Sequence, residues 1–400
     1  MSTHSPAVSV EAPPDVFSPA QLGPITLRNR VIKSATFEGC TPKGLVTDQL
    51  IDYHLAVARG GVGMTTVAYL AVAPDGRTHG EQIYWRPEAL PGLARLTAAI
   101  HETGAKVSAQ IGHAGPVANA RSNRAPSYAP TRRFNPAGLT FDRRVSTQDI
   151  QRIVEQHAQA AVYAREVGFD AVEVHFGHNY LASAFLSPAM NRRRDEFGGS
   201  IARRAEFPRR ILAAIRERVG HDIAVIAKLN MVDGYRGGTH LEHSIPTAQL
   251  LESDGHLDAL VLTGGSSLMN PMYLFRGGAP VREFAATWPN PQRLGIRLVG
   301  RWFLKAYPWE PLYFLEDARQ FRAALKMPLV LLGGVVDKAG MDTAMREGFP
   351  FVGMARALLR EPDLVNRIQA QPTTPSLCIH CNRCMPTIYS GTRCPVIPTP

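Results

Sequence analysis

The stretch Gly168-Phe-Asp-Ala-Val-Glu-Val-His-Phe-Gly-His-Asn-Tyr180 shows how this chain alternates between helix and strand. Its first glycine closes a helical pattern, and the segment Ala171–Phe176 that follows is short and rich in apolar residues. Such a run is expected of a strand that is buried on both faces. His175 ends the predicted strand, and His178 and Tyr180 follow it in a tight turn. The stretch therefore predicts a helix–strand unit with polar groups after its strand.

Short apolar runs of this kind recur along the chain, separated by helical patterns. The predicted strands are Arg30–Ser34, Met64–Tyr69, Lys106–Ile111, Ala171–Phe176, Ala224–Leu229, Ala259–Thr263, Leu329–Leu332 and Phe351–Met354. The predicted helices are Asp48–Arg59, Pro87–Thr103, the segment from Ile150 to Gly168, Ile201–Val219, Thr247–Glu252, Phe314–Leu325 and Lys338–Glu347. This alternation predicts an α/β fold, a TIM (β/α)8 barrel. A doubly wound open sheet is the alternative, but no Gly-x-Gly-x-x-Gly follows the first run to support it.

The sequence divides into three predicted parts. We expect a flexible N-terminal arm at 1–16, the barrel at 17–370 and a Cys-rich tail at 371–400. The arm lacks the basic start and the apolar core of a secretory signal. The spacer between the sixth and seventh predicted strands runs from 264 to 327, and loops of that length in a barrel are usually lids or substrate walls.

Composition narrows the class of protein. Of the 400 residues 45% are hydrophobic, which excludes wholesale disorder, and no run approaches the ~18 apolar residues of a membrane-spanning helix. The five cysteines are unevenly placed, unlike a secreted disulfide framework, so we expect a cytoplasmic protein. The net charge is +10, but the basic residues are dispersed. We therefore expect a solvated face with a few anion contacts, and neither nucleic acid nor a membrane as partner.

Polar residues and glycines follow most of the predicted strands, where a barrel carries its active site. Gly333 and Gly334 leave backbone N–H groups bare after the seventh strand, and Arg356 offers a guanidinium fork after the eighth. Together they suit a phosphate. The alternative is that the glycines only make a tight turn and that Arg356 pairs with a carboxylate.

Gln110 and Lys228 end the third and fifth predicted strands. An amide and an ammonium group that point inward could hold the polar edge of a planar heterocycle. Lys228 could instead form a Schiff base, as in an aldolase or lyase. A buried ion pair is the structural alternative for this lysine.

His175 and His178, three residues apart around a strand end, could converge on one anionic oxygen, with Tyr180 as a nearby proton donor. A His-x-x-His metal pair is the rival interpretation, although no acidic third ligand lies close by in sequence. Histidines satisfied by their neighbours are the structural alternative.

These motifs, taken together, resemble the old yellow enzyme family. The matching segments are Asn29–Val31, Ser34–Gly39, 110–115, 125–127, 168–188, 191–200 with Arg204, 354–356 and 359–364. The resemblance covers roughly residues 16 to 396, and it looks closest to the NADH:flavin oxidoreductase and 2,4-dienoyl-CoA reductase branch.

The resemblance implies a barrel that holds FMN and is reduced by NADH or NADPH. It places Ala35 and Thr36 along the flavin, Gln110 and Lys228 at its pyrimidine edge, and Gly333, Gly334, Ala355 and Arg356 at its phosphate. It implies hydride transfer from flavin N5 to an activated C=C bond, of the enone or enoyl type. His175 and His178 would hold the carbonyl oxygen and Tyr180 would give the proton. Because the dienoyl-CoA reductases lack the paired histidines, an ene-reductase-like site is favoured.

Four cysteines crowd the tail: Cys378, Cys381, Cys384 and Cys394. They resemble the [4Fe–4S] segment of the dienoyl-CoA and trimethylamine dehydrogenase branch. A cluster, a structural zinc and a metal-free vestige all remain open. Two further hypotheses follow: a flavin/Fe–S dehydrogenase that acts with a separate electron-transfer partner, and a nucleic-acid binder with a zinc ribbon. The sequence is compatible with a homo-oligomer and does not define the oligomeric state.

Overall fold

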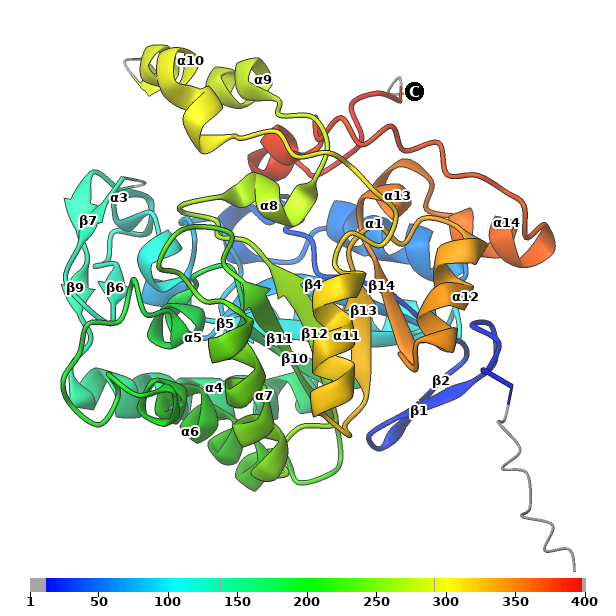
Figure 1. Cartoon of the computed structure of the whole chain (residues 1–400), viewed down its shortest axis with the longest axis horizontal. Helices are drawn as coiled ribbons and strands as arrows, with labels where there is room; N and C mark the ends of the chain where they lie inside the picture. Colours follow the sequence, from blue (N-terminus) through cyan, green and yellow to red (C-terminus); the bar gives the residue numbers. More distant parts are fainter. Residues whose placement is uncertain (1–11, 137, 291, 398–400) are drawn as a thin grey trace, which may run out of the picture.

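The computed structural model describes residues 12–136, 138–290 and 292–397. Eight parallel strands close into a barrel in the order β10-β11-β12-β13-β14-β3-β4-β5 (Figure 1). Their bounds are Val31–Lys33 (β3), Met64–Ala71 (β4), Lys106–Gly112 (β5), Ala171–Phe176 (β10), Ala224–Val232 (β11), Ala259–Gly264 (β12), Leu329–Leu332 (β13) and Phe351–Met354 (β14). The TIM-barrel prediction is confirmed, and each strand lies where an apolar run predicted it.

Helices surround the barrel between successive strands. The main ones are Asp48–Arg59 (α1), Leu90–His101 (α2), Thr147–Glu166 (α4), Ile201–Val219 (α6), Leu241–Ser253 (α7), Leu315–Ala324 (α11), Lys338–Arg346 (α12) and Leu364–Ala370 (α14). α4 begins at the predicted capping box, in which Ser146 and Asp149 satisfy each other's backbone N–H groups. α7 starts before the predicted Thr247, because the helix accommodates Pro246, a residue that disfavours helix interiors.

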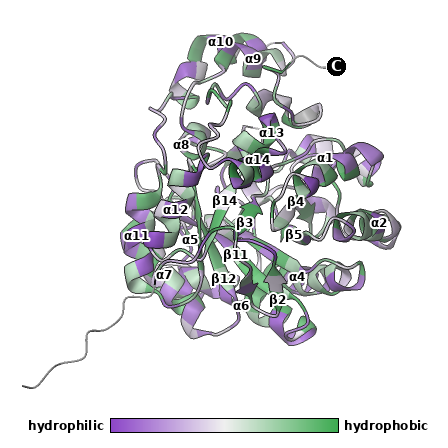
Figure 2. Ribbon diagram, turned by 90° about the vertical axis from the view of Figure 1, so that its right-hand side faces the viewer, coloured by the Kyte–Doolittle hydropathy of each residue, from purple (hydrophilic) through white to green (hydrophobic). Residues whose placement is uncertain are grey.

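The apolar core has two layers. One lies between the strands and the helices, and the other fills the inside of the barrel at its N-terminal end. Figure 2 shows hydrophobic residues concentrated on the barrel strands and hydrophilic residues on the outer faces of the helices. A hairpin of β1 (Ala20–Leu22) and β2 (Ile25–Leu27), absent from the sequence prediction, buries Leu22 and Leu27 against the inner layer. The N-terminal end of the barrel is therefore closed.

The C-terminal end of the barrel is covered by the long spacer after β12 and by the tail. The spacer forms α8 (Pro271–Phe275), α9 (Val281–Ala286) and α10 (Gln292–Phe303), at the top of Figure 1. The tail crosses the same end, where the backbone of Gly391 and Thr392 bonds to that of Gly39 and Glu38.

Two observations bear on the predicted division into arm, barrel and tail. Residues 1–11 of the arm and 398–400 of the tail lie outside the described residues. Val16, the last residue of the predicted arm, is fully buried in the core. Of the helices in the described part of the chain, none is long and apolar enough to span a membrane.

Candidate active site

A buried carboxylate organises the inside of the barrel near its C-terminal end. Glu173 Oε1 accepts hydrogen bonds from Gln110 Nε2 at 2.6 Å and from Lys228 Nζ at 2.8 Å. Glu173 lies directly beside Gln110 in the register of β10 with β5. The structure thus brings the two predicted pyrimidine-edge residues together. Sequence reasoning missed Glu173. It lies two residues before His175 on β10, so both side chains are expected on the same, inward face of the strand.

A second buried cation, Lys33, stands close to this group. Its Nζ lies 3.8 Å from Glu38 Oε1 and donates to the carbonyl of Thr66. Burial lowers the pKa of Lys33 to about 8, although the charge of Glu38 opposes that shift. Glu38 also accepts from the backbone N–H of Ala68 at 3.0 Å and bonds His54 Nε2 at 3.1 Å. The barrel end therefore presents two lysines, each beside a buried carboxylate.

The paired histidines and the tyrosine do converge. The ring centroid of His175 lies 5.1 Å from that of His178 and 4.4 Å from that of Tyr180. His178 and Asn179 adopt left-handed backbone conformations, with φ of 59° and 60°, and this turn folds His178 back toward His175. Tyr69, at the end of β4, stacks edge-on against Tyr180 at 5.3 Å.

Both imidazoles are neutral near pH 7. Burial lowers the pKa of His178 to about 3, with a further contribution from the charge of Lys228. Burial also sets the pKa of His175 well below its usual value, and the neighbouring His178 and Lys228 act in the same direction. A neutral imidazole has one N–H to donate. The pair can therefore offer two hydrogen bonds to a single oxygen without carrying charge themselves.

The tyrosine lies in a small apolar cluster at the strand ends. Its buried part includes Ala68, Tyr69 and Ala114, and Ala35 and Tyr180 are among the residues that pack against it. The hydroxyl of Tyr69 donates to the carbonyl of Gly76 and is thereby engaged. The expected proton donor and Ala35, one of the residues expected along a flavin, thus pack against the same cluster.

Three of the residues predicted to bind a phosphate, Gly333, Gly334 and Arg356, lie near Tyr313. A Cβ at Gly333 or Gly334 would lie within 3.0 Å of the Tyr313 ring, and both glycines have positive φ. Arg356 lies close enough to the Tyr313 hydroxyl to lower its pKa, although burial raises that pKa more strongly. Arg356 also donates to the carbonyl of Arg276 at 2.9 Å and to the side chain of Asn382.

This arrangement supports the phosphate interpretation in one respect and the structural alternative in another. The close approach of Tyr313 accounts for Gly333 and Gly334 without a phosphate. The alternative partner of Arg356, a carboxylate, is not found within 4.0 Å among the described residues. The guanidinium and the two glycines nevertheless lie near the same residue, Tyr313, after the last two barrel strands, where barrels often bind a phosphate.

The residues present fit a flavin at the barrel end. His175 Nδ1 is buried and has no hydrogen-bond partner in the described part of the chain, which is costly unless a ligand supplies one. Gln110 and Lys228 supply the amide and the cation that suit a polar heterocycle edge. Thr36, expected along the flavin, is tied by its hydroxyl to the carbonyl of Ser34, and Ala355 caps the helix that carries Arg356.

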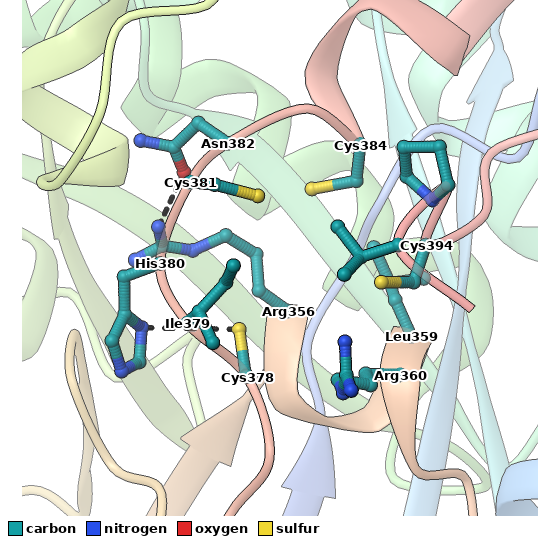
Figure 3. A pocket seen from close by; sticks show the side chains of 12 residues that line it. Arg356, Leu359, Arg360, Cys378, Ile379, His380, Cys381, Asn382, Cys384 and Cys394 are labelled. Carbon is teal, nitrogen blue, oxygen red and sulfur yellow. Dashed lines mark hydrogen bonds between the residues drawn. The ribbon is translucent and has the colours of Figure 1, made fainter.

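The four tail cysteines line one pocket together with Arg356, Arg360 and His380 (Figure 3). All four are free thiols. Burial raises the pKa of the Cys384 thiol to about 12, and the three neighbouring cysteines raise it further while Arg356 lowers it. No three His, Cys, Asp or Glu side chains within the described ranges are placed to hold a metal ion. The arrangement therefore gives no support to the expected cluster or zinc at Cys378, Cys381, Cys384 and Cys394, because spacing alone does not fix where thiols on an irregular segment point.

Comparison with known proteins identifies the family. The NADH:flavin oxidoreductase / NADH oxidase family matches residues 15–258. The chain belongs to this family. It is therefore a flavin-dependent oxidoreductase, and a nicotinamide cofactor is the reductant that the family name indicates.

Curated relatives of this flavin oxidoreductase are reductases and oxidases. It is 53% identical over 383 residues to the 4,4'-dithiodibutanoate disulfide reductase of Rhodococcus erythropolis, across 96% of this chain and 95% of the relative. It is 31% identical to a metal reductase of Desulforamulus reducens, across 94% of this chain but only 52% of that protein. The chain thus spans nearly the whole of the first relative and about half of the second.

Solved structures share the fold of this flavin oxidoreductase. A 2-naphthoyl-CoA reductase superposes with a TM-score of 0.81 at 24% identity, over 96% of this chain and 57% of that one. An old yellow enzyme homologue from Zymomonas mobilis superposes with a TM-score of 0.72 at 20% identity, over 96% and 98% of the two chains. The resemblance drawn from the sequence motifs is confirmed.

Proposed function

We propose that this enzyme binds FMN, takes electrons from NADH or NADPH, and reduces a C=C bond conjugated to a carbonyl group. The convergence of His175, His178 and Tyr180 at one barrel end supports this proposal most directly. The balanced reaction is enone + NAD(P)H + H⁺ → saturated ketone + NAD(P)⁺. When bound, FMN supplies the hydride chemistry.

The protein groups have separate roles in this proposal. Negative charge develops on the carbonyl oxygen as the β-carbon is reduced, and two neutral imidazoles can donate to that oxygen. Losing one such donor costs ~3–4 kcal/mol in comparable oxyanion sites. Tyr180 gives a proton to the α-carbon. Lys228 and Gln110, fixed by Glu173, bind the pyrimidine edge of the flavin, and Arg356 with the Gly333–Gly334 backbone binds its phosphate.

The test combines spectroscopy with product analysis. The purified enzyme should show flavin absorption near 450 nm that NADH or NADPH bleaches without oxygen, and the flavin released on denaturation should be FMN. Added 2-cyclohexen-1-one should restore the band and yield cyclohexanone. A band that no activated alkene restores would rule out alkene reduction, and released FAD would rule out the single-phosphate cofactor.

Disulfide reduction is a second candidate, because of the 53% identity to the Rhodococcus erythropolis enzyme over nearly all of both chains. The balanced reaction is RSSR + NAD(P)H + H⁺ → 2 RSH + NAD(P)⁺. The name of that relative points to an aliphatic disulfide with terminal carboxylates. Thiol release from 4,4'-dithiodibutanoate, measured beside enone reduction at equal enzyme concentration, decides which substrate class is preferred.

A further inference from the structure

Side chains at the ends of two neighbouring strands contact His178 by hydrogen bonds. Asn230 and Thr263 face each other in the register of β11 with β12. Asn230 Oδ1 accepts the backbone N–H of His178 at 3.0 Å, and Thr263 Oγ1 lies 3.1 Å from His178 Nε2. Asn230 and Thr263 are both buried. The backbone and the ring of one histidine are thus each held by a separate side chain.

The turn that carries His178 needs such support. His178 and Asn179 both have φ near 60°, which costs a non-glycine residue free energy unless the surroundings hold it there. At Gly177 a Cβ would lie 3.1 Å from Asn230 Oδ1 and 3.2 Å from Thr263 Cγ2. Only a glycine lets the two strand-end side chains come this close to the turn.

Hydrogen bonds of its amide nitrogen fix the orientation of the Asn230 side chain. Its Nδ2 donates to Asp233 Oδ1 at 2.8 Å and to the carbonyl of Gly265 at 2.7 Å. Asp233 is itself held, since its other oxygen accepts from Ser187 and from the backbone of Thr239, both at 2.8 Å. Because both amide protons are used, the carbonyl oxygen of Asn230 must face His178.

The contact to Thr263 decides where the single ring proton of His178 lies. Thr263 is fully buried, and across the described residues its hydroxyl has no hydrogen-bond acceptor other than His178 Nε2. A buried hydroxyl that donates to nothing is costly, so the hydroxyl donates to Nε2. The ring proton is then on Nδ1, for which no hydrogen bond to the described part of the chain is found.

We propose that Asn230 and Thr263 are positioning residues that hold His178 as its Nδ1–H tautomer, so that Nδ1–H faces the substrate oxygen. The catalytic purpose of this tautomer rests on the proposed alkene reduction, whereas the tautomer itself follows from the contacts of His178 alone. The opposite tautomer would present a lone pair to the developing oxyanion and would oppose the reaction.

The experiment uses the flavin-loaded enzyme with ¹⁵N-labelled histidine. Among the 13 histidines, the signals of His178 are assigned by their loss in His178→Gln. We expect the Nδ1–H pattern in the wild type, a change toward Nε2–H in Thr263→Val, and recovery in Thr263→Ser. Reoxidation of the reduced flavin by 2-cyclohexen-1-one should slow by about tenfold or more in Thr263→Val, with reduction by NAD(P)H unchanged.

Thr65→Val is the matched control, because Thr65 Oγ1 makes a similar contact of 2.8 Å to Nδ1 of the buried His54. It should leave the tautomer of His178 unchanged. An Nε2–H pattern in the wild type, or a tautomer unmoved in Thr263→Val, overturns the proposal. If the tautomer responds as expected but no activated alkene reoxidises the flavin, the positioning role stands and the proposed function fails.

Discussion

Lys228 Nζ lies 2.8 Å from Glu173 Oε1, and both side chains are almost completely buried, at 3% and 2% exposed. This is the ion pair that the sequence left open as the structural alternative for Lys228. It argues against a Schiff base, because Nζ is occupied by its contact to the buried carboxylate instead of being free to attack a carbonyl group. It does not conflict with flavin binding, since a fixed ammonium group is what the pyrimidine edge would meet.

The first prediction concerns this pair. Glu173→Leu should destabilise the enzyme by ~3–5 kcal/mol, because it leaves the charge of Lys228 buried without a partner. Glu173→Leu combined with Lys228→Met should cost less, since it removes both charges. Urea unfolding of the flavin-free protein measures the two losses. A double variant less stable than Glu173→Leu would show that the pair is not the source of the effect.

Much of this fold could be predicted from the sequence. Parallel strands buried on both faces leave continuous apolar runs, so all eight barrel strands were found. Strand ends were less certain: β11 continues to Val232, past the predicted Leu229, because the polar Asn230 interrupts the apolar run from which the strand was predicted. The β1–β2 hairpin was missed because its strands are only three residues long.

The site was predicted less completely. The residues of a short local motif, such as His175 to Tyr180, are brought together by the turn that they form, so their proximity could be predicted. Contacts that cross the barrel, such as Glu173 with Lys228 or Thr263 with His178, depend on register between strands that lie far apart in sequence. The metal interpretation of the tail failed to gain support for a related reason. The cysteines are on irregular backbone, whose side-chain directions no spacing rule determines.

The second prediction concerns pH. His178 and His157 have pKa values lowered to about 3 and about 4, chiefly by burial, whereas an unfolded histidine titrates near 6.5. The unfolded chain therefore binds more protons below pH 6.5. Stability should be fully present above pH 6.5 and should fall as the pH drops from 6.5 toward 4.

The melting temperature measured between pH 4 and 8 checks this. His157→Gln, on helix α4, should flatten the acid side of the profile. An unchanged slope in that variant would mean that His157 is not held neutral. Alkene reduction should show no loss from imidazole titration between pH 6 and 8.

The third prediction concerns the phosphate site. Arg356→Ala should lower FMN occupancy strongly, because it removes a cation that lies beside Tyr313, the residue against which Gly333 and Gly334 pack. Arg360→Ala is the control, since Arg360 lines the cysteine pocket one helical turn further on. The ratio of flavin absorbance to protein reports both. Equal FMN content in Arg356→Ala and the wild type would contradict the assigned site.

The fourth prediction concerns Tyr180. Tyr180→Phe keeps the ring that packs against Tyr69 and His175 but removes the acidic proton. Turnover of simple enones should fall by ~10² or more if protonation limits the rate. Nitroalkenes should suffer less, since water protonates their anionic products readily. Tyr69→Phe is the matched control: a wild-type enone rate in Tyr180→Phe, or an equal loss in Tyr69→Phe, would remove the proton-donor role.

The measurement that tests the central claim most directly is anaerobic stopped-flow absorbance of the flavin in the wild type, His175→Ala and His178→Ala. It separates reduction by NAD(P)H from reoxidation by 2-cyclohexen-1-one. If the histidines hold the substrate oxygen, each variant should keep reduction near the wild-type rate and lose reoxidation by ~10² or more. Equal losses in the two half-reactions, or wild-type reoxidation in both variants, would contradict the account.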